Sequence, residues 1–257
     1  MLRGLYSSVS SMITLQSRQG IITNNLANVN TTGYKEETLV AKSFDEVMLS
    51  NRDSYTNGNP KRQEIGSMSF GVGIDDTITS FKQGVHISTE NNTDFAINGA
   101  GFFKVLDGNN NPFYTRDGSF KINTQGYLVT NAGHQVTGIN NMTGNEEPIY
   151  VGNSKIVVTP DNNINLEGVN KYTFNIVDFQ DYKGLVKRGD NLYSGENAIK
   201  ANAFKIKQGY LEGSNVDAIA TTALLMETVK EFEANQKVIQ TIDSTLSRIA
   251  NEIGTVR

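Results

Sequence analysis

Near its C-terminal end the chain carries an apolar residue at every seventh position. The uninterrupted row consists of Leu225, Phe232, Ile239, Leu246 and Ile253. A spacing of seven keeps such side chains on one face of a helix and is typical of a coiled coil. It predicts a helix over residues 213–253, roughly 60 Å long, with Ser214 or Asn215 as the cap of its N-terminus.

The second row of this predicted seam is less apolar than the first. We place it three positions before each member of the first row, at Thr222, Val229, Gln236, Asp243 and Ala250. Ile242 and Ile249 lie just outside the seam and widen the apolar face. A helix whose apolar residues exceed one stripe usually has more than one neighbour. We therefore expect this helix to pack among several copies of the chain.

The N-terminal segment has the same three- and four-residue spacing and predicts a helix over residues 2–29. The positions that carry the pattern are Leu2, Leu5, Tyr6, Val9, Met12, Ile13, Gln16, Gln19, Ile22, Leu26 and Val29. The pattern ends before Gly33, which suits a left-handed turn after a helix. Residues 1–40 thus form a helix and a turn, and we expect them to build a coiled-coil stem with the C-terminal helix, residues 213–257.

Between the helical segments the period of the apolar residues changes from 3.6 to 2. Short alternating runs separated by turn sequences extend over 66–212, for example at 101–106, 171–179 and 204–207. Short strands at this spacing indicate an all-β domain built from hairpins. The preceding stretch, residues 41–65, is irregular and mostly polar. We predict an extended polar linker or insertion, flexible alone and ordered by a neighbour in an assembly.

The predicted fold class is α+β, with a helix at each end and an all-β domain inserted between them. The terminal helices can meet only if the inserted domain returns the chain to the place where it started. Such a layout is not typical of an enzyme. It favours a filament subunit, with a helical stem toward an axis and a β domain outside it.

A search for catalytic or ligand-binding motifs finds no candidate. The chain has no cysteine, which excludes disulfides, thiolate nucleophiles and cysteine-ligated metals. His86 and His134 are the only histidines, and we interpret both as surface or hairpin residues. The Gly-rich stretches at 71–76 and 98–103 lead into strand-like sequence and lack the helix N-terminus that binds phosphate. We therefore predict no enzyme activity, no cofactor, no metal and no small-molecule substrate.

Charge and hydropathy narrow the choice of partner and compartment. The net charge of -4 gives no reason to expect nucleic acid as a partner. No stretch reaches the roughly 18 apolar residues that a transmembrane helix needs. The N-terminal sequence MLRGLYSSVSSMITLQ lacks the unbroken apolar region of a secretory signal. If the protein leaves the cell, we expect it to leave without a cleaved signal.

The stretch NNLANVNTTGYK at 24–35 resembles the signature that ends the N-terminal helix of flagellar basal-body rod and hook proteins. Further motifs of that family follow in the family's order. They are DFAINGAGFFKV at 94–105, YTRDGSFKINTQGYLVTNAG at 114–133, QGYLEGSNVD at 208–217 and EFEANQKVIQTIDSTL at 231–246. Because these motifs spread over nearly the whole chain, the resemblance is specific.

The resemblance implies a structural rod subunit that stacks helically into a stiff tube and transmits torque from motor to hook. It implies export by the flagellar type III apparatus and an extracytoplasmic place in the basal body, across the cell wall. The partners would be further copies of the chain, neighbouring rod and hook proteins and the export apparatus. The polar segment at 50–65 resembles the distal rod type. Lys230-Glu231-Phe232 departs from the Arg-x-Tyr of that type and leaves the proximal rod type open.

The predicted assembly interface combines the helical seams with the asparagines at the end of the first helix. It consists of Leu5, Val9, Met12, Asn24, Asn25, Leu26, Asn28, Leu225, Val229, Phe232, Gln236, Ile239, Leu246 and Ile253, with Gly33 as the turn residue. We expect the asparagines, Asn30 included, to satisfy backbone groups or to contact neighbouring subunits.

Other functions stay open at this point. A hook-type axial protein would carry a further β domain and be longer. A stalked cell-surface binding module would need an N-terminal signal or anchor, which this sequence does not display. A rod-associated enzyme that cuts peptidoglycan would need a catalytic carboxylate in a cleft, and no pair of carboxylates is marked out by its setting.

Overall fold

The structure is a computed structural model that describes residues 2–56, 59–201 and 204–253. The chain separates into two compact units. Unit 1 combines Met1–Leu26, Glu37–Ile78 and Ala218–Arg257, and unit 2 combines Ala27–Glu36 with Thr79–Asp217. Each unit therefore brings together segments that are far apart in the sequence.

Helices α1 (Leu2–Ala27) and α2 (Ala218–Ile253) correspond to the predicted terminal helices. The second helix begins at Ala218 and not at residue 213, so the predicted caps do not lie at its N-terminus. Asn215 instead accepts a hydrogen bond of 2.8 Å from the Glu36 amide and donates one of 2.7 Å to the Ser80 carbonyl. These bonds hold the chain extended before the helix starts.

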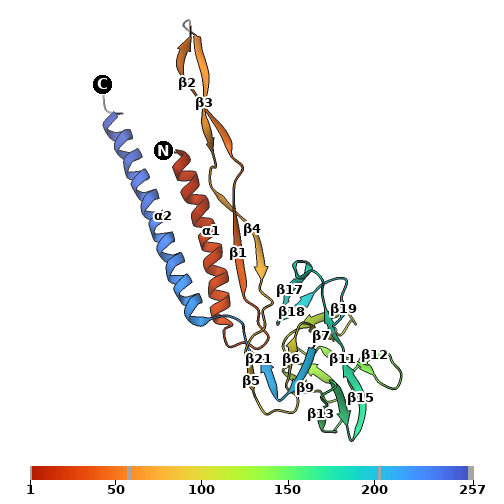
Figure 1. Cartoon of the computed structure of the whole chain (residues 1–257). Coiled ribbons are helices and arrows are strands. Elements are labelled where there is room, and N and C mark those ends of the chain that lie inside the picture. The colour runs from red at the N-terminus through yellow and green to blue at the C-terminus, as the bar shows by residue number, and fades with distance from the viewer. Residues whose placement is uncertain (1, 57–58, 202–203, 254–257) are drawn as a thin grey trace. The chain divides into compact units, whose positions relative to one another are not determined.

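The helices of unit 1 run antiparallel and side by side (Figure 1). Asn235 Nδ2 of α2 donates a hydrogen bond of 3.1 Å to Ser11 Oγ of α1. A side chain added at Gly4 would touch Ile242 Cδ1 at 3.8 Å. The two contacts are seven residues apart on each helix, so the same face of each helix meets the other at both contacts.

Strands complete unit 1. Their bounds are β1 Glu37–Ser43, β2 Val47–Thr56, β3 Asn59–Met68 and β4 Val72–Thr79. β2 and β3 form a long antiparallel hairpin in which Val47 lies opposite Met68, and β1 pairs with β4 (Figure 1). Most of the described part of the insertion predicted at 41–65 is therefore paired strand and not an irregular loop. Backbone hydrogen bonds hold such a ladder together even where the side chains are polar, so the apolar pattern does not reveal it.

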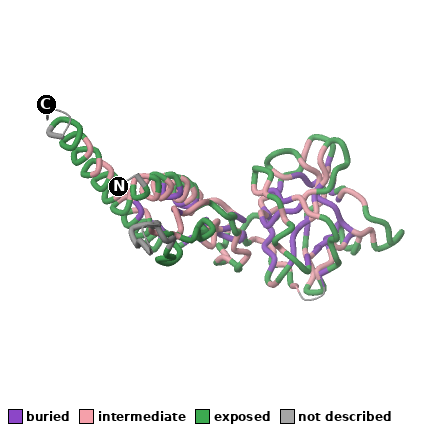
Figure 2. The backbone as a smooth tube through the Cα atoms, turned by 90° about the horizontal axis from the view of Figure 1, so that it is seen from above, coloured by how far each residue is buried: buried purple, intermediate pink, exposed green. Residues whose placement is uncertain are grey.

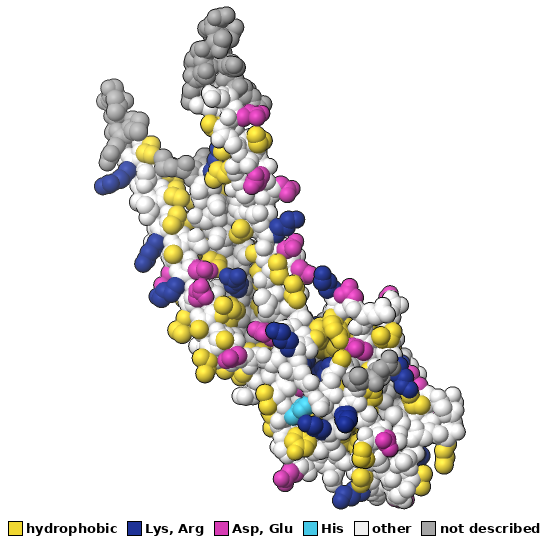
Figure 3. Space-filling model, in the orientation of Figure 1, with side chains coloured by type: hydrophobic (Ala, Val, Ile, Leu, Met, Phe, Trp, Pro, Cys, Tyr) yellow, Lys and Arg dark blue, Asp and Glu magenta, His cyan; other side chains and the backbone are white. Residues whose placement is uncertain are grey.

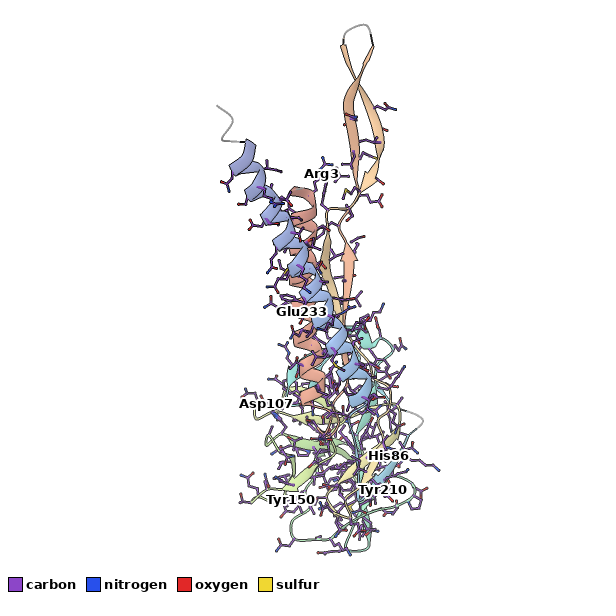
Figure 4. The ribbon with its side chains drawn as sticks, turned by 90° about the vertical axis from the view of Figure 1, so that its left-hand side faces the viewer. Arg3, His86, Asp107, Tyr150, Tyr210 and Glu233 are labelled. Carbon is purple, nitrogen blue, oxygen red and sulfur yellow. The ribbon has the colours of Figure 1, made fainter. Side chains whose placement is uncertain are left out.

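The chain between the hairpin and β4 packs closely on α1. The Val72 amide donates a hydrogen bond of 3.3 Å to Ser10 Oγ. Any side chain at Gly71 would clash with Ser10. The guanidinium of Arg3, which lies near the start of α1 (Figure 4), stacks over the Phe70 ring at 5.6 Å. Unit 1 is thus a helix pair with a strand layer against its first helix.

Unit 2 is built from short strands joined by turns, and thirteen of its described strands join one sheet. These strands are β7 Phe102–Leu106, β8 Pro112–Thr115, β9 Phe120–Ile122, β10 Leu128–Thr130, β11 Gln135–Asn140, β12 Glu146–Pro148, β13 Ile156–Val158, β14 Asn163–Leu166, β15 Val169–Phe174, β16 Ile176–Asp178, β17 Val186–Gly189, β18 Leu192–Ser194 and β19 Ile199–Lys200. Two further ladders pair β6 Phe95–Gly99 with β20 Phe204–Gln208, and β5 His86–Ser88 with β21 Tyr210–Glu212.

The main path of the sheet has the order β13-β14-β15-β11-β7-β8-β18-β17, and its neighbours pair antiparallel. A short 3-10 helix, Tyr182–Gly184, connects β16 to β17. Aromatic rings fill the centre of unit 2. Phe95, Phe103, Phe120 and Phe174 pack with ring centroids 5.0 to 6.1 Å apart. This core belongs to unit 2 alone.

Burial differs sharply between the units. Figure 2 shows buried segments gathered inside unit 2, whereas exposed and partly buried residues dominate the helices of unit 1. The fold class is α+β, as the sequence predicts, with terminal helices flanking a large β domain along the chain. Unit 2 has its own apolar core, whereas much of the apolar surface of unit 1 remains in contact with solvent.

Candidate assembly surface

The apolar row of α2 is partly buried at each of its described positions. The residues concerned are Leu225, Phe232, Ile239 and Leu246. The side chain of Ile253, the last predicted member, lies outside the described residues. The row is therefore turned toward the rest of unit 1.

The second row of the seam lies on the opposite side of the first row from the predicted one. Buried or partly buried are Thr221, Thr228, Asn235 and Ile242. Exposed are the predicted positions Thr222, Gln236, Asp243 and Ala250, while Val229 is partly buried. Residues three before and three after a heptad position flank it equally on a helix, so the spacing alone cannot choose between them. The packing of α1 against α2 decides which of the two flanking rows is buried.

The polar groups of this seam are satisfied within the helix pair. Thr228 Oγ1 donates a hydrogen bond of 2.8 Å to the Leu224 carbonyl, and Thr14 Oγ1 donates one of 3.1 Å to the Ser10 carbonyl. Buried hydroxyls that bond the preceding helical turn avoid the cost of burying an unpaired polar group. The pair is therefore compatible with a half-polar seam.

Charged residues line the solvent side of the helix pair. An Arg18 guanidinium nitrogen lies 3.8 Å from a Glu231 carboxylate oxygen, and each side chain is a little under half exposed. Lys230 Nζ lies 2.8 Å from Glu233 Oε2 on α2 (Figure 4). The hydrogen bond from Lys230 lowers the pKa of the Glu233 carboxyl. Solvent screens exposed pairs of this kind and they contribute little to stability, so they do not hold the helices together by themselves.

Among the predicted interface residues of α1, Leu5, Met12 and Leu26 are partly buried. Val9 is exposed, and it shares a stripe with Tyr6 and Ile13, which are 68% and 58% exposed. Spacings of three and four place these side chains on one helix face. The described part of unit 1 leaves this face uncovered.

α2 also carries exposed apolar side chains. They are Ile219, Leu224, Met226, Val238 and Ile249. Figure 3 shows hydrophobic side chains recurring along the helical part of the molecule. Monomeric soluble proteins seldom expose apolar surface over such a length. Within the described residues, no helix is both long and apolar enough to cross a membrane.

The strands of unit 1 extend the exposed apolar surface. The residues are Phe44, Val47, Met48, Ile65, Met68, Ile74 and Ile78. Sequence reasoning missed the members up to residue 65 because it treats 41–65 as a polar linker, and it assigned the later ones to the all-β domain over 66–212. The short run Val47-Met48-Leu49 was the available signal, but an isolated apolar run does not reveal which strand it pairs with.

The asparagines at the end of α1 and just after it have different surroundings. Asn25 is buried, donates a hydrogen bond of 2.7 Å to the Glu37 carbonyl and accepts one of 3.1 Å from the Glu37 amide. Its side chain thus binds backbone groups within unit 1, which is one of the two roles expected for these asparagines. Asn28 Oδ1 accepts a hydrogen bond of 3.1 Å from Thr31 Oγ1. Asn24 is exposed.

Gly33 occupies the left-handed turn that its position suggests, with φ of 67°. Its amide donates a hydrogen bond of 2.8 Å to the Glu212 carbonyl. A side chain added here would lie 2.4 Å from the Asp117 amide nitrogen. The turn therefore needs glycine both for its backbone angle and for the close approach of the loop after β8.

The histidines do not come together. His134 Nδ1 lies 3.4 Å from Asp107 Oδ1, and His86 Nε2 lies 3.0 Å from Gln83 Nε2. Figure 4 shows His86 and Asp107 on different sides of unit 2. Across the described ranges, no group of three or more His, Asp or Glu side chains is arranged to hold a metal ion.

Protein-family models match the chain in each of its parts. The model described as "Flagella basal body rod protein" matches residues 5–35, which contain most of α1 and the Gly33 turn. The model "Flagellar hook protein FlgE/F/G D1 domain" matches 96–173 in unit 2. The model "Flagellar basal body rod FlgEFG protein C-terminal" matches 207–252, from the end of β20 through most of α2.

Curated relatives match along almost the whole chain. The flagellar hook-basal body complex protein FlhO of Bacillus subtilis (strain 168) is 31% identical over 100% of both chains. The flagellar basal-body rod protein FlgG of the same organism is 32% identical over 98% of this chain and 99% of its own length. The flagellar basal-body rod protein FlgF of Caulobacter vibrioides is 31% identical over 96% of each chain. The similarity therefore includes both units and is not confined to the helical ends.

Proposed function

This chain belongs to the flagellar basal-body rod protein family, and on that basis we propose that it forms the distal rod, a helical tube that transmits torque from motor to hook. The family is structural, and the chain is a basal-body component and not an enzyme. Assembly with neighbouring flagellar components follows from membership of the family.

The observation that carries the proposal is the uncovered stripe of Tyr6, Val9 and Ile13 on α1. Burial of apolar surface stabilises by about 25 cal/mol per Å², so a second copy that covers this stripe stabilises the assembly. Each subunit of a tube repeats the contact with its neighbours. Many modest contacts that act together give a stable and stiff structure.

We infer that α1 and α2 of successive copies pack into a coiled-coil stem. The apolar rows of both helices then gain partners beyond the single chain, with Leu225, Phe232, Ile239 and Leu246 inside the bundle. The polar seam positions support this arrangement, because polar residues at a seam select one register over others. The partners in this proposal are further copies of the chain and the adjoining rod and hook proteins.

The proposal also covers how the protein leaves the cytoplasm and where it is located after assembly. A rod subunit that crosses the cell wall must leave the cytoplasm, and we propose export by the flagellar type III apparatus without a cleaved signal. The heptad-patterned ends suit this route, because helices that are completed by neighbours can form after transport. The assembled protein then lies outside the cytoplasmic membrane, in the basal body.

The distal rod is preferred to the proximal rod on the basis of one segment. Residues 50–65 resemble the distal rod type, and they fold into most of the β2–β3 hairpin. A two-stranded hairpin standing alone is only marginally stable, so this one fits a role against a neighbouring subunit. The departure at Lys230-Glu231-Phe232 keeps the proximal rod as the alternative.

Replacement of Ile13 by Asp tests the structural role. Ile13 is largely exposed, so Ile13→Asp leaves the isolated chain folded, but it places a charge in the proposed interface. In cells that carry only the variant, we expect electron micrographs of purified basal bodies to lack complete rods. The matched control is Met142→Asp, an equally drastic change of an exposed apolar residue in a turn of unit 2.

The same cells separate this function from the alternatives. Labelling with an antibody should find the parent chain in purified basal bodies. If the antibody instead finds the chain over the whole cell surface, and cells that lack the chain still build normal rods, a stalked binding module would be favoured. Normal rods in the Ile13→Asp cells would show that the exposed stripe is not an assembly surface.

A further inference from the structure

Every covalent connection between the units passes through three stretches of unit 2. These stretches are residues 27–36, 79–86 and 210–217. They contain charged side chains that are completely buried, namely Lys35 and Glu212, both with 0% side-chain exposure. Arg116, from the loop after β8, is also buried, with 4% of its side chain exposed. We call Lys35, Arg116 and Glu212 the buried ion cluster.

Glu212 is the centre of the cluster. Its Oε1 lies 2.6 Å from Lys35 Nζ and accepts a hydrogen bond of 2.9 Å from the Gly84 amide. Its Oε2 lies 3.2 Å from Arg116 Nη1. Lys35 Nζ also donates a hydrogen bond of 2.8 Å to the Lys82 carbonyl. One carboxylate thus binds all three connecting stretches.

Neutral hydrogen bonds join the same three stretches. Asn215 bonds the Glu36 amide and the Ser80 carbonyl through its side chain, at 2.8 and 2.7 Å. The Ser80 amide donates to the Glu36 carbonyl at 2.8 Å, and the Gly213 amide donates to the Val85 carbonyl at 2.8 Å. The stretches are therefore cross-connected in pairs as well as through Glu212.

Stability alone is a poor explanation of the cluster. A buried ion pair must lose its hydration, and its replacement by apolar residues of similar size is often neutral or stabilising. Burial lowers the pKa of Lys35, and the attraction of Glu212 only partly opposes this effect. Buried charges can instead select one arrangement of the chain over others, because a displaced partner leaves an unpaired charge.

We propose that the buried ion cluster is a clamp that holds the three connecting stretches in one arrangement, so that a force reaching any of them is shared by all three. Lys35, Arg116 and Glu212 are positioning residues in this role. The load-sharing part rests on the proposed torque-bearing function. The clamp itself is a property of the isolated chain.

The test removes the charges together and keeps the volume. In the full chain, the triple variant Lys35→Met, Arg116→Met, Glu212→Leu leaves no buried charge unpaired. The matched control removes a partly exposed ion pair elsewhere in unit 2, with Lys104→Met and Glu146→Gln. Hydrogen exchange of backbone amides is then compared among the parent, the triple variant and the control.

We expect selective loosening in the triple variant. Amides at Ser80, Gly84 and Gly213 should exchange about tenfold faster, because local opening no longer breaks an ion cluster. Amides of the core strands β7 and β11 should keep their rates, and the control should match the parent throughout. Unchanged exchange in the connecting stretches would overturn the clamp, and so would equal acceleration everywhere, since that is general destabilisation.

Asn215→Ala provides a second variant if the triple variant fails to fold. Asn215 is partly exposed, and its removal should loosen the Glu36 and Ser80 amides while the core strands keep their exchange rates. Unchanged protection of these amides would overturn the part of the proposal in which neutral hydrogen bonds of Asn215 join the three stretches.

Swimming under load addresses the mechanical part separately. Cells with the triple variant should build rods but lose speed more steeply than parent cells as the viscosity of the medium rises. An unchanged dependence on viscosity would overturn load sharing. Absence of the parent chain from purified rods, together with the expected exchange pattern in the isolated triple variant, would overturn the rod function and leave the clamp supported.

Discussion

At the scale of single residues, Thr32 and Gly33 in the turn after α1 are constrained by their contacts with Asp117. Gly33 and Asp117 belong to different parts of the sequence of unit 2, and their backbones meet. Thr32 Oγ1, beside this contact, donates a hydrogen bond of 2.8 Å to Asp117 Oδ1. The family signature in the sequence therefore includes residues whose importance depends on a loop 85 residues away.

We expect Gly33→Ala to destabilise unit 2. The left-handed conformation costs an L-residue about 1–2 kcal/mol, and the added methyl group also meets the Asp117 backbone. The free energy of unfolding, measured with urea, should fall by at least about 1–2 kcal/mol. Gly108→Ala is the control, because nothing lies within 4 Å of a side chain added there. Equal stability of the two variants would contradict this account of the turn.

Asp117 should make stability depend on pH. Burial raises the pKa of its carboxyl above the ordinary value of 3.8, and hydrogen bonds from Ser119 and Thr32 oppose the shift only in part. The folded state therefore binds a proton at a pH where the unfolded state does not. The free energy of unfolding must then rise as the pH falls from the raised pKa to 3.8, and must not change further through this group below it.

Comparison with Asp117→Asn isolates this contribution. Asparagine can still accept the hydrogen bond from Thr32 but does not titrate. The difference in unfolding free energy between the parent and the variant should shift in favour of the parent as the pH falls through that window. Urea unfolding at a series of pH values measures it. A difference that stays constant with pH would show that the Asp117 carboxyl titrates normally.

At the scale of elements, α2 presents different surfaces on its different sides. The row from Leu225 to Leu246 is partly covered by unit 1, whereas Ile219 and Met226 are exposed. The hairpin β2–β3 has the same character, with apolar side chains such as Val47 and Ile65 exposed. Elements of this kind fold within one chain, but they leave apolar surface exposed that further partners can cover.

We predict that Leu225→Asp or Leu246→Asp blocks assembly while unit 2 stays folded. A carboxylate in the seam is costly to bury, by several kcal/mol, and neither residue belongs to unit 2. Sedimentation of assembled material and the melting of unit 2 by circular dichroism report the two effects. Thr241→Asp, at an exposed position of the same helix, should assemble normally. Unfolding of unit 2 in the leucine variants would contradict the separation of roles.

At the scale of the whole molecule, the two units differ in how much of their stability comes from packing within the unit itself. Unit 2 encloses an aromatic core around Phe95, Phe103 and Phe174. Unit 1 buries few large apolar side chains, among them Leu15, Ile22 and Leu39. Helical stability in proteins comes mainly from packing of an apolar face. Unit 1 therefore depends more on neighbours than unit 2 does.

Hydrogen exchange on the purified chain and on assembled material should reveal this difference. Amides of α1 and α2 should exchange fast in the isolated chain and become protected on assembly, while the core strands of unit 2 are protected in both states. Equal protection of the helices before and after assembly would mean that they already satisfy each other. That outcome would favour a stalked module over a rod subunit.

The family, the α+β class and the positions of the helices to within a few residues can all be predicted from the amino-acid sequence. Each of these depends on local information. The heptad row at Leu225, Phe232 and Ile239 requires only the periodicity of one helix. The turn at Gly33 requires only the conformational freedom of one residue.

Three features depend on the tertiary structure. They are the side of that row that faces α1, the pairing of β2 with β3, and the shared burial of Lys35 and Glu212. Flanking positions on a helix are equivalent until a neighbour is placed, and a polar strand is recognised only through its partner strand. Lys35 and Glu212 are ordinary charged residues in the sequence, 177 positions apart. Their pairing depends on how the chain returns to its starting point, and no local pattern encodes that path.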